Sequence, residues 1–253
     1  MINKYVIILN LNIFIFLAGN VSFAQDLFVN SDSEKELYSE INDQNSVKPT
    51  RYDFETFDDW QYSHQDTCTK MQYRIADGNL FLSTRAGTYD RTKARLKSVK
   101  LGVGKSSCRV FVPTMYAFDQ TSIASFLYCD DKHELDFEIG YGKAEVRALH
   151  NAKENEVLCY MTSQGYPFQS EIVKLEMGHW YVIDIDITLK DGAYFVQWLI
   201  DGEVKATLQQ TFGEEVKFTP VLSLENLKFL GDHIPKNNYE VEFDWLEIVS
   251  YEE

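Results

Sequence analysis

The sequence predicts an all-β domain, either a sandwich or a barrel, from three observations. After residue 50, short runs rich in Val, Ile, Phe and Tyr recur along the chain. Turn signals such as Asp77-Gly78, Lys190-Asp191-Gly192 and Asp201-Gly202 separate them. No amphipathic helical stretch of ordinary length follows residue 50, and there is no internal repeat or low-complexity linker. Regularly spaced strands with turn signals are typical of these two architectures, and we expect a single domain.

The chain begins with the pattern of a secretory signal. Lys4 precedes an apolar run over residues 5–17, and Ser22-Phe23-Ala24 has the small-x-small pattern of a cleavage site. The apolar run is shorter than the ~20 residues that a membrane-spanning helix needs. We therefore expect a signal peptide over residues 1–24, cleaved near Ala24, and a secreted or periplasmic protein. A polar, acidic leader is expected over residues 25–50, before the β domain over residues 51–253.

The charge of the chain limits its partners. The sequence has 24 Lys and Arg against 39 Asp and Glu, a net charge of −15. Such a surface argues against nucleic acid and anionic lipid as partners, but it does not oppose a neutral polysaccharide. We expect a monomer that does not insert into a membrane once its signal is cleaved.

The predicted strands follow one another in short steps. The first strand, residues 79–84, follows the turn Asp77-Gly78, and the third, residues 108–112, ends before Pro113. The two other turn signals join residues 181–189, 194–200 and 203–208 into hairpins. Each run is enriched in β-branched or aromatic residues, which favour strands. The predicted strands are residues 79–84, 94–100, 108–112, 122–128, 133–140, 144–149, 181–189, 194–200, 203–208, 220–224 and 239–249.

One of these strands, residues 133–140, has the sequence His-Glu-Leu-Asp-Phe-Glu-Ile-Gly. Because side chains alternate along a strand, Glu134, Asp136 and Glu138 share one face, and apolar residues occupy the other. Paired carboxylates of this kind suit retaining glycoside hydrolysis, in which one ionised acid attacks the sugar and a protonated one supplies a proton. The middle acid can hydrogen bond to the attacking one and help keep a neighbour protonated. Cα atoms four residues apart are about 13 Å apart in a flat strand. A retaining pair needs carboxyl groups only ~5–5.5 Å apart, so the acidic face must be concave.

The alternative is a solvated strand face without chemistry. Glu240-Val241-Glu242-Phe243-Asp244 alternates three acids in the same way, so the spacing alone does not distinguish the two strands.

The four cysteines, Cys68, Cys108, Cys129 and Cys159, leave two alternatives open. An exported chain with an even number of cysteines can form disulfides, and four cysteines allow three connectivities. Cys108 and Cys129 would face each other if residues 106–112 and 123–129 pair as antiparallel strands. Free buried thiols are the alternative, and the wide spacing disfavours a zinc site.

Several motifs in order resemble glycoside hydrolase family 16. The run Glu134-Leu135-Asp136-Phe137-Glu138 resembles the E-x-D-x-E strand of that family. Before it, Ala94-Arg95-Leu96-Lys97-Ser98 with Gly104 and Arg109 resembles the stretch that precedes the family's site. After it, residues 196–202 resemble the I-x-W-Y-V-D-G hairpin and residues 243–248 the closing V-D-Y-V-R-V strand. The resemblance covers roughly residues 52–250.

This resemblance implies a β-jelly-roll sandwich of two curved antiparallel sheets with a sugar cleft on the concave one. It implies that Glu134 is the nucleophile, Asp136 its assistant and Glu138 the acid/base, in an enzyme that cleaves a β-linked glucan or galactan. No cofactor is implied for catalysis. A structural calcium on the convex sheet is implied as possible, with Asp244 as the matching residue.

The sequence departs from the family where a tryptophan usually precedes the catalytic strand, because Leu127 stands there. Tyr128 and Trp180 are among the aromatic residues that could stack on the sugar in its place. Arg109 lies near the cleft by its position in the family pattern and is a further candidate for substrate contact, with a structural ion pair as the alternative. A non-catalytic carbohydrate-binding module on the same fold is the main alternative, and a structural surface domain without a sugar ligand is a third possibility.

Overall fold

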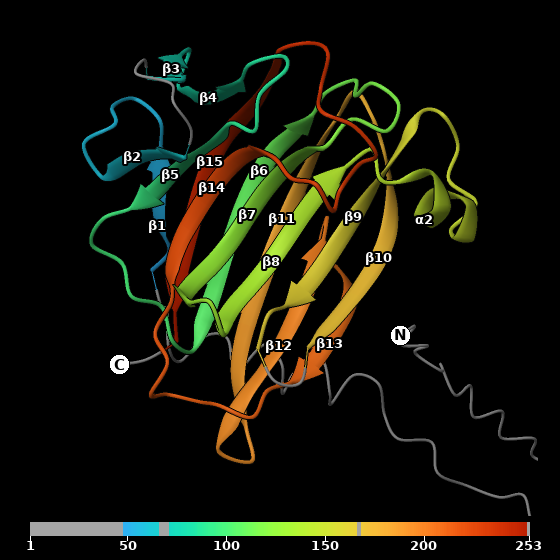
Figure 1. Cartoon of the computed structure of the whole chain (residues 1–253). Coiled ribbons are helices and arrows are strands. Elements are labelled where there is room, and N and C mark those ends of the chain that lie inside the picture. The colour runs from blue at the N-terminus through green and yellow to red at the C-terminus, as the bar shows by residue number, and fades with distance from the viewer. Residues whose placement is uncertain (1–47, 66–70, 166–167, 252–253) are drawn as a thin grey trace, which may run out of the picture. The chain divides into compact units, whose positions relative to one another are not determined.

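The computed structural model describes residues 48–65, 71–165 and 168–251, which form two antiparallel sheets (Figure 1). One sheet, here the groove sheet, has seven strands. In spatial order they are β10 (Gln169–Glu176), β9 (Glu156–Ser163), β8 (His133–Gly140), β7 (Thr121–Asp130), β14 (Thr219–Asn226), β5 (Arg91–Leu96) and β2 (Trp60–Gln65).

The other sheet, here the back sheet, has eight strands among the described residues. Its order is β13 (Glu203–Gln209), β12 (Ala193–Ile200), β11 (His179–Lys190), β6 (Gly104–Val112), β15 (Tyr239–Ser250), β4 (Asn79–Thr84) and β3 (Tyr73–Ala76), and β1 (Thr50–Asp53) pairs with β15. The two antiparallel sheets confirm the predicted all-β jelly-roll sandwich.

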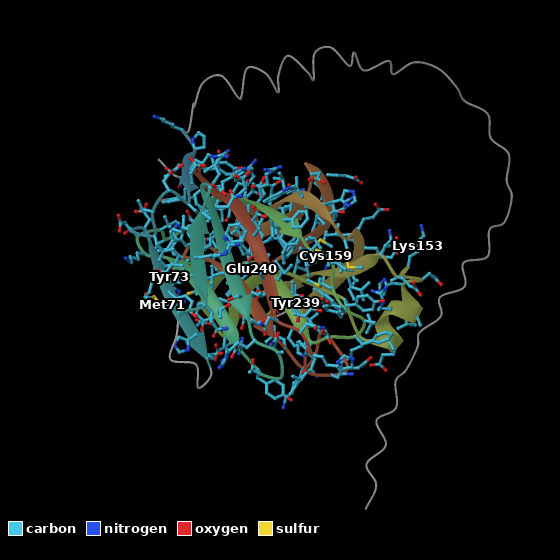
Figure 2. All side chains as sticks on the ribbon, turned by 90° about the horizontal axis from the view of Figure 1, so that it is seen from above. Met71, Tyr73, Lys153, Cys159, Tyr239 and Glu240 are labelled. Carbon is cyan, nitrogen blue, oxygen red and sulfur yellow. The ribbon has the colours of Figure 1, made fainter. Side chains whose placement is uncertain are left out.

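The core lies between the inner faces of the two sheets. On β8, Leu135, Phe137 and Ile139 have no exposed surface, so the apolar half of this strand faces inward as its alternation predicts. The back sheet contributes large buried side chains such as that of Trp198. Figure 2 shows the side chains from above, and those of Cys159 on β9 and Tyr239 on β15 are both buried. Core packing thus leaves the acids of β8 on the outer face of the groove sheet.

Residues Ala144–Leu149, predicted as a strand, form the short helix α2. The run consists mostly of good helix formers, such as Ala, Glu, Arg and Leu. Gly142, at φ +89°, turns the chain out of β8 before the helix. The buried guanidinium of Arg147 then fixes the helix, because it donates hydrogen bonds to the carbonyl oxygens of Tyr141 (2.6 Å) and Glu156 (2.8 Å).

Cys108 and Cys129 do not face each other, so the suggested disulfide is wrong. Strands β6 and β7 belong to different sheets, and Cys108 is buried in the core while Cys129 is exposed. Cys159, on β9, is also buried, and all three carry free thiols. Cys68 lies outside the described residues.

The predicted signal peptide over residues 1–24 and the leader up to residue 47 lie outside the described residues. Within the described part of the chain, no helix has the length and apolar character needed to cross a membrane.

Candidate active site

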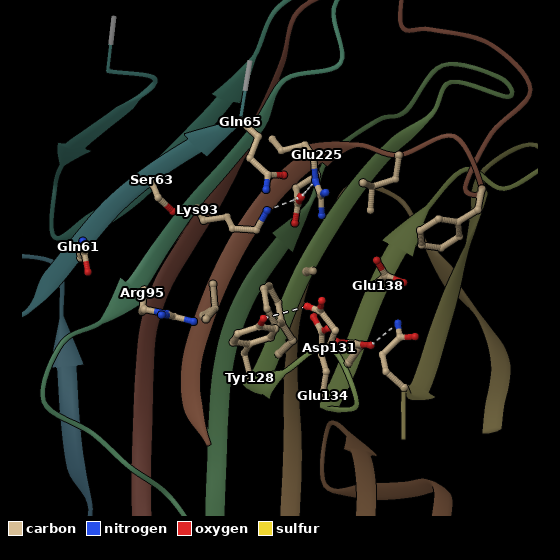
Figure 3. Close-up of a pocket in the computed structure, with 18 residues that line it drawn as sticks. Gln61, Ser63, Gln65, Lys93, Arg95, Tyr128, Asp131, Glu134, Glu138 and Glu225 are labelled. Atoms are coloured by element: carbon tan, nitrogen blue, oxygen red, sulfur yellow. Dashed lines mark hydrogen bonds and ion pairs between the residues drawn. The ribbon is translucent and has the colours of Figure 1, made fainter. Parts of the chain in front are cut away.

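A groove of about 640 Å³ lies over the outer face of the groove sheet (Figure 3). Side chains from β2, β5, β14, β7 and β8 line it, together with Asp131, Gln164 and the loop residues Leu227 and Phe229. Glu134, Asp136 and Glu138 are all among these lining residues. The structure therefore brings the three predicted acids together on one hollowed face.

Packing on the opposite face of β8 fixes the register that exposes these acids. A slip of one residue would turn Phe137 and its apolar neighbours into the groove and bury the carboxylates. The indole Nε1 of Trp198, on the back sheet, donates a hydrogen bond to the backbone oxygen of Asp136 at 3.1 Å. The backbone nitrogen of Gln164 donates to the oxygen of Glu134 at 3.0 Å. Both hydrogen bonds add to those between β8 and its paired strands and help to fix its position.

Asp136 is the most deeply buried of the three acids, with 3% of its surface exposed. Its burial, followed by the negative charges of Glu134 and Glu138, raises its pKa well above the ordinary value. Its carboxyl group is hydrogen bonded to that of Glu134 and accepts a hydrogen bond from Gln164 Nε2 at 3.1 Å. Asp136 therefore holds its proton more tightly than an ordinary aspartic acid and donates it toward Glu134.

Glu134 and Glu138 have different surroundings. Burial raises the pKa of Glu134 and the charge of Glu225 adds to this, whereas the hydrogen bond with Asp136 lowers it. The charges of Lys93 and Arg91 lower the pKa of both Glu134 and Glu138. Burial, then the negative charges of Glu225 and Glu134, raises the pKa of Glu138 to about 8. Near neutral pH, Glu134 is thus the better carrier of a negative charge and Glu138 the better carrier of a proton.

Glu225 on β14 is a fourth carboxylate in the groove that the sequence analysis missed. It is 3% exposed and forms ion pairs with Arg91 and with Lys93, the latter at 2.6 Å. The hydroxyl of Ser223 also donates a hydrogen bond to it at 2.9 Å. The sequence pattern could have indicated this residue. Glu225 directly follows the predicted strand 220–224 and continues the outward alternation of Val221 and Ser223.

Tyr128 lies in the groove, where the sequence analysis placed it. Its hydroxyl donates a hydrogen bond to Asp131 Oδ1 at 3.0 Å, and the Arg95 guanidinium lies 5.2 Å from the centre of its ring. Leu127, by contrast, is fully buried and points into the core. Phe126 and Phe229 are further aromatic residues that line the groove.

Arg109 and Trp180 do not lie in the groove, which corrects their assignment to the cleft. They belong to β6 and β11 of the back sheet, and the Arg109 guanidinium is 4.4 Å from the centre of the Trp180 ring. The flanking residues Cys108 and Val110 face the core, so alternation directs Arg109 to the outer face of the back sheet. Both residues therefore lie on the side of the sandwich opposite the groove.

The carboxylate of Asp244, the residue suggested as a calcium ligand, forms an ion pair with Arg109. Across the described ranges, no group of three or more His, Cys, Asp and Glu side chains is arranged to hold a metal ion.

Among the solved structures that share this fold are an endo-glucanase and a transglycosylase. One structure with this fold is a LamA variant from Z. galactanivorans in complex with laminaritriose and laminaritetraose, with a TM-score of 0.55, 12% identity and coverage of 79% of this chain and 98% of that one. Another is a glycoside hydrolase family 16 endo-glucanase from Bacteroides ovatus, with a TM-score of 0.54, 14% identity and coverage of 79% and 99%. A third is the Crh5 transglycosylase, with a TM-score of 0.59, 16% identity and coverage of 81% and 85%.

At these identities the similarity shows the fold alone, and the chain has the fold of the family 16 glycoside hydrolases, as its motifs indicate. No protein-family model matches the sequence, and no curated protein matches it.

Proposed function

We propose that the protein is a retaining endo-glycoside hydrolase that cleaves a β-linked polysaccharide, a β-glucan or a galactan. The observation that carries this proposal is the contrast between Glu134 and Glu138 on one strand of an open groove. The first shares a hydrogen bond with Asp136, and burial and nearby carboxylates raise the pKa of the second to about 8. An anionic acid beside a protonated one is what a retaining mechanism requires.

In the first step, the Glu134 carboxylate attacks the anomeric carbon while Glu138 gives its proton to the glycosidic oxygen. The carbon–oxygen bond to the leaving sugar breaks, and a covalent glycosyl-enzyme forms on Glu134. In the second step, the ionised Glu138 removes a proton from water, which attacks the same carbon and releases Glu134. Both carboxyl groups return to their starting states.

Asp136 acts on this cycle through Glu134. Its proton supports the charge of Glu134 before attack, and its burial raises the pKa at which that proton is lost. The bond from Gln164 fixes the orientation of Asp136. We regard both as positioning residues.

The groove and the structural neighbours both support the proposed substrate class. The groove extends across β8, β7, β14, β5 and β2, which suits an extended chain better than a single sugar. The LamA variant was solved with laminari-oligosaccharides, which supports a β-linked polymer here as well. Export, as the Lys4 and apolar pattern of the first residues predicts, would bring the enzyme to such polymers.

The direct experiment is a screen of β-linked polysaccharides with product sizing, using the parent and the Glu134→Gln variant. The parent should release oligosaccharides of several lengths from at least one polymer. Glu134→Gln should lose this activity by roughly 10⁴-fold or more, because the nucleophile is removed, while circular dichroism shows an unchanged fold. Binding without cleavage by the parent would identify a carbohydrate-binding module instead, and a fully active Glu134→Gln would rule out the assignment.

A further inference from the structure

The side of the groove away from the acids carries a row of cationic side chains. Arg91, Lys93 and Arg95 alternate along β5, and all three line the groove. Their partners on β2 are Gln65, Ser63 and Gln61, which also line it. This edge is therefore rich in hydrogen-bond donors, as Figure 3 shows for the labelled residues.

Two of these cations already have a protein partner. Arg91 and Lys93 both pair with the buried Glu225, and burial lowers the pKa of Lys93. Arg95 differs, because no carboxylate of the described residues forms an ion pair with it. Its guanidinium lies over the ring of Tyr128 and faces the groove. A guanidinium held on an aromatic ring keeps its donors available for a planar or tetrahedral anion.

Strand register places Arg95 relative to the cleavage site. Arg95 pairs with Val221, Val221 with Phe126, and Phe126 with Asp136, so a row of outward side chains crosses the groove from β5 to β8. Three strand spacings separate the backbones of Arg95 and Asp136 by about 14 Å. A group bound at Arg95 therefore belongs to a sugar unit away from the bond that is cleaved.

We propose that Arg95, with Tyr128 and Gln61, forms a subsite for an anionic substituent, a carboxylate or a sulfate ester, on a sugar unit of the polysaccharide. The Tyr128 ring offers the apolar face of a sugar a stacking surface, and Gln61 adds a neutral hydrogen-bond donor. This inference rests on the proposed function, because it describes the substrate of the same groove.

The acidity of the whole chain does not conflict with this subsite. The net charge of −15 is spread over the protein, and charges beyond about 8 Å are largely screened at physiological ionic strength. Within the groove, two cations balance the carboxylate of Glu225, and burial with nearby carboxylates raises the pKa of Glu138 to about 8. Asp131 and Glu134 also lie near the Tyr128 ring. Neither forms an ion pair with Arg95, whose guanidinium lies over the ring.

The test compares Arg95→Gln with Arg109→Gln, which removes a second ring-stacked arginine outside the groove. Each full-length variant and the parent are assayed for binding and for cleavage on a uronic-acid polymer, a sulfated polymer, and the carboxyl-reduced and desulfated forms of the two. The parent should bind one anionic polymer at least ~10-fold more tightly than its neutral form, the value expected for a charged hydrogen bond. Arg95→Gln should lose that preference, Arg95→Lys should keep part of it, and Arg109→Gln should keep all of it.

The outcomes separate the subsite from the enzymatic proposal. Arg95-dependent binding to an anionic polymer without cleavage would support the subsite and refute hydrolysis. The subsite would be overturned, and hydrolysis left standing, if the parent cleaved the neutral and anionic forms of a polymer at equal rates. An equal fall in the cleavage of both forms in Arg95→Gln would have the same meaning. No binding to any of the polymers would overturn the subsite. Which anionic polymer the parent prefers identifies carboxylate or sulfate as the group recognised.

Discussion

Two strands of this protein alternate three acids with apolar residues, yet their surroundings differ. On β15, in the back sheet, each acid has its own partner from another strand of that sheet: Glu240 pairs with Arg74 at 2.7 Å, Glu242 accepts a hydrogen bond from Asn79 at 2.5 Å, and Asp244 pairs with Arg109. The Glu240 and Arg74 side chains are about half exposed. Two of the three acids are thus paired with an arginine and the third with an amide, as on an ordinary strand face.

On β8 the three acids are packed against one another. The nearest cations, Arg91 and Lys93, are paired with Glu225, and burial raises the pKa of Asp136 and Glu138. Burying these acids close together lowers the stability of the fold, because the loss of hydration and the like charges both disfavour the ionised carboxylates. The comparison shows that the alternation of acids identifies a strand face, whereas burial and counter-charges determine whether that face can perform acid–base chemistry.

The largest effect that sharpens this comparison is expected from Glu138→Gln, with Glu242→Gln as the matched control. An amide cannot deliver a proton to the leaving oxygen, so kcat/KM on the cleaved polysaccharide should fall by about 10²- to 10⁴-fold. Glu242→Gln makes the same chemical change on β15 and should alter kcat/KM by less than about twofold. Its stability in urea should also stay within about 0.5 kcal/mol of the parent.

Equal losses in the two variants would break the comparison, because they would show that the acids of β8 have no special role. Circular dichroism of both variants is the control for folding.

A smaller effect is expected from Glu225→Gln on the pH dependence of kcat/KM. In the parent, activity should decline as pH rises through about 8, because Glu138 then loses the proton it must donate. Removal of the Glu225 charge eliminates a cause of that raised pKa and frees Arg91 and Lys93 to stabilise the ionised Glu138. The basic limb of the profile should therefore move to lower pH. A basic limb that stays in place, or moves upward, would exclude Glu225 from the tuning of Glu138.

Much of the fold was predictable, because alternation and turn signals are local. Strand β4 was predicted with its observed bounds, and the hairpin β11–β12 within two residues. Strands β1, β2, β3, β9 and β10 were not predicted, and Ala144–Leu149 was assigned the wrong structure. The helix depends on contacts of Arg147 with distant carbonyl groups, which a short run does not reveal.

The site was predictable only along the strand that carries it. Glu134, Asp136 and Glu138 share a face because of their spacing, and Tyr128 follows from the neighbouring strand. Glu225 lies roughly ninety residues further along the chain, and it approaches them only through the order of β8, β7 and β14 in the sheet. Arg109 was assigned to the wrong sheet for the same reason, because strand order across two sheets depends on long-range pairing.

The measurement that tests the central claim most directly is the anomeric configuration of the first products, followed by NMR on the polysaccharide that the parent cleaves. If Glu134 forms a covalent intermediate and Glu138 acts twice, the new reducing end should appear first as the β-anomer and reach equilibrium only later. An α-anomer as the first product would show inversion and would contradict the roles assigned to the two acids of β8.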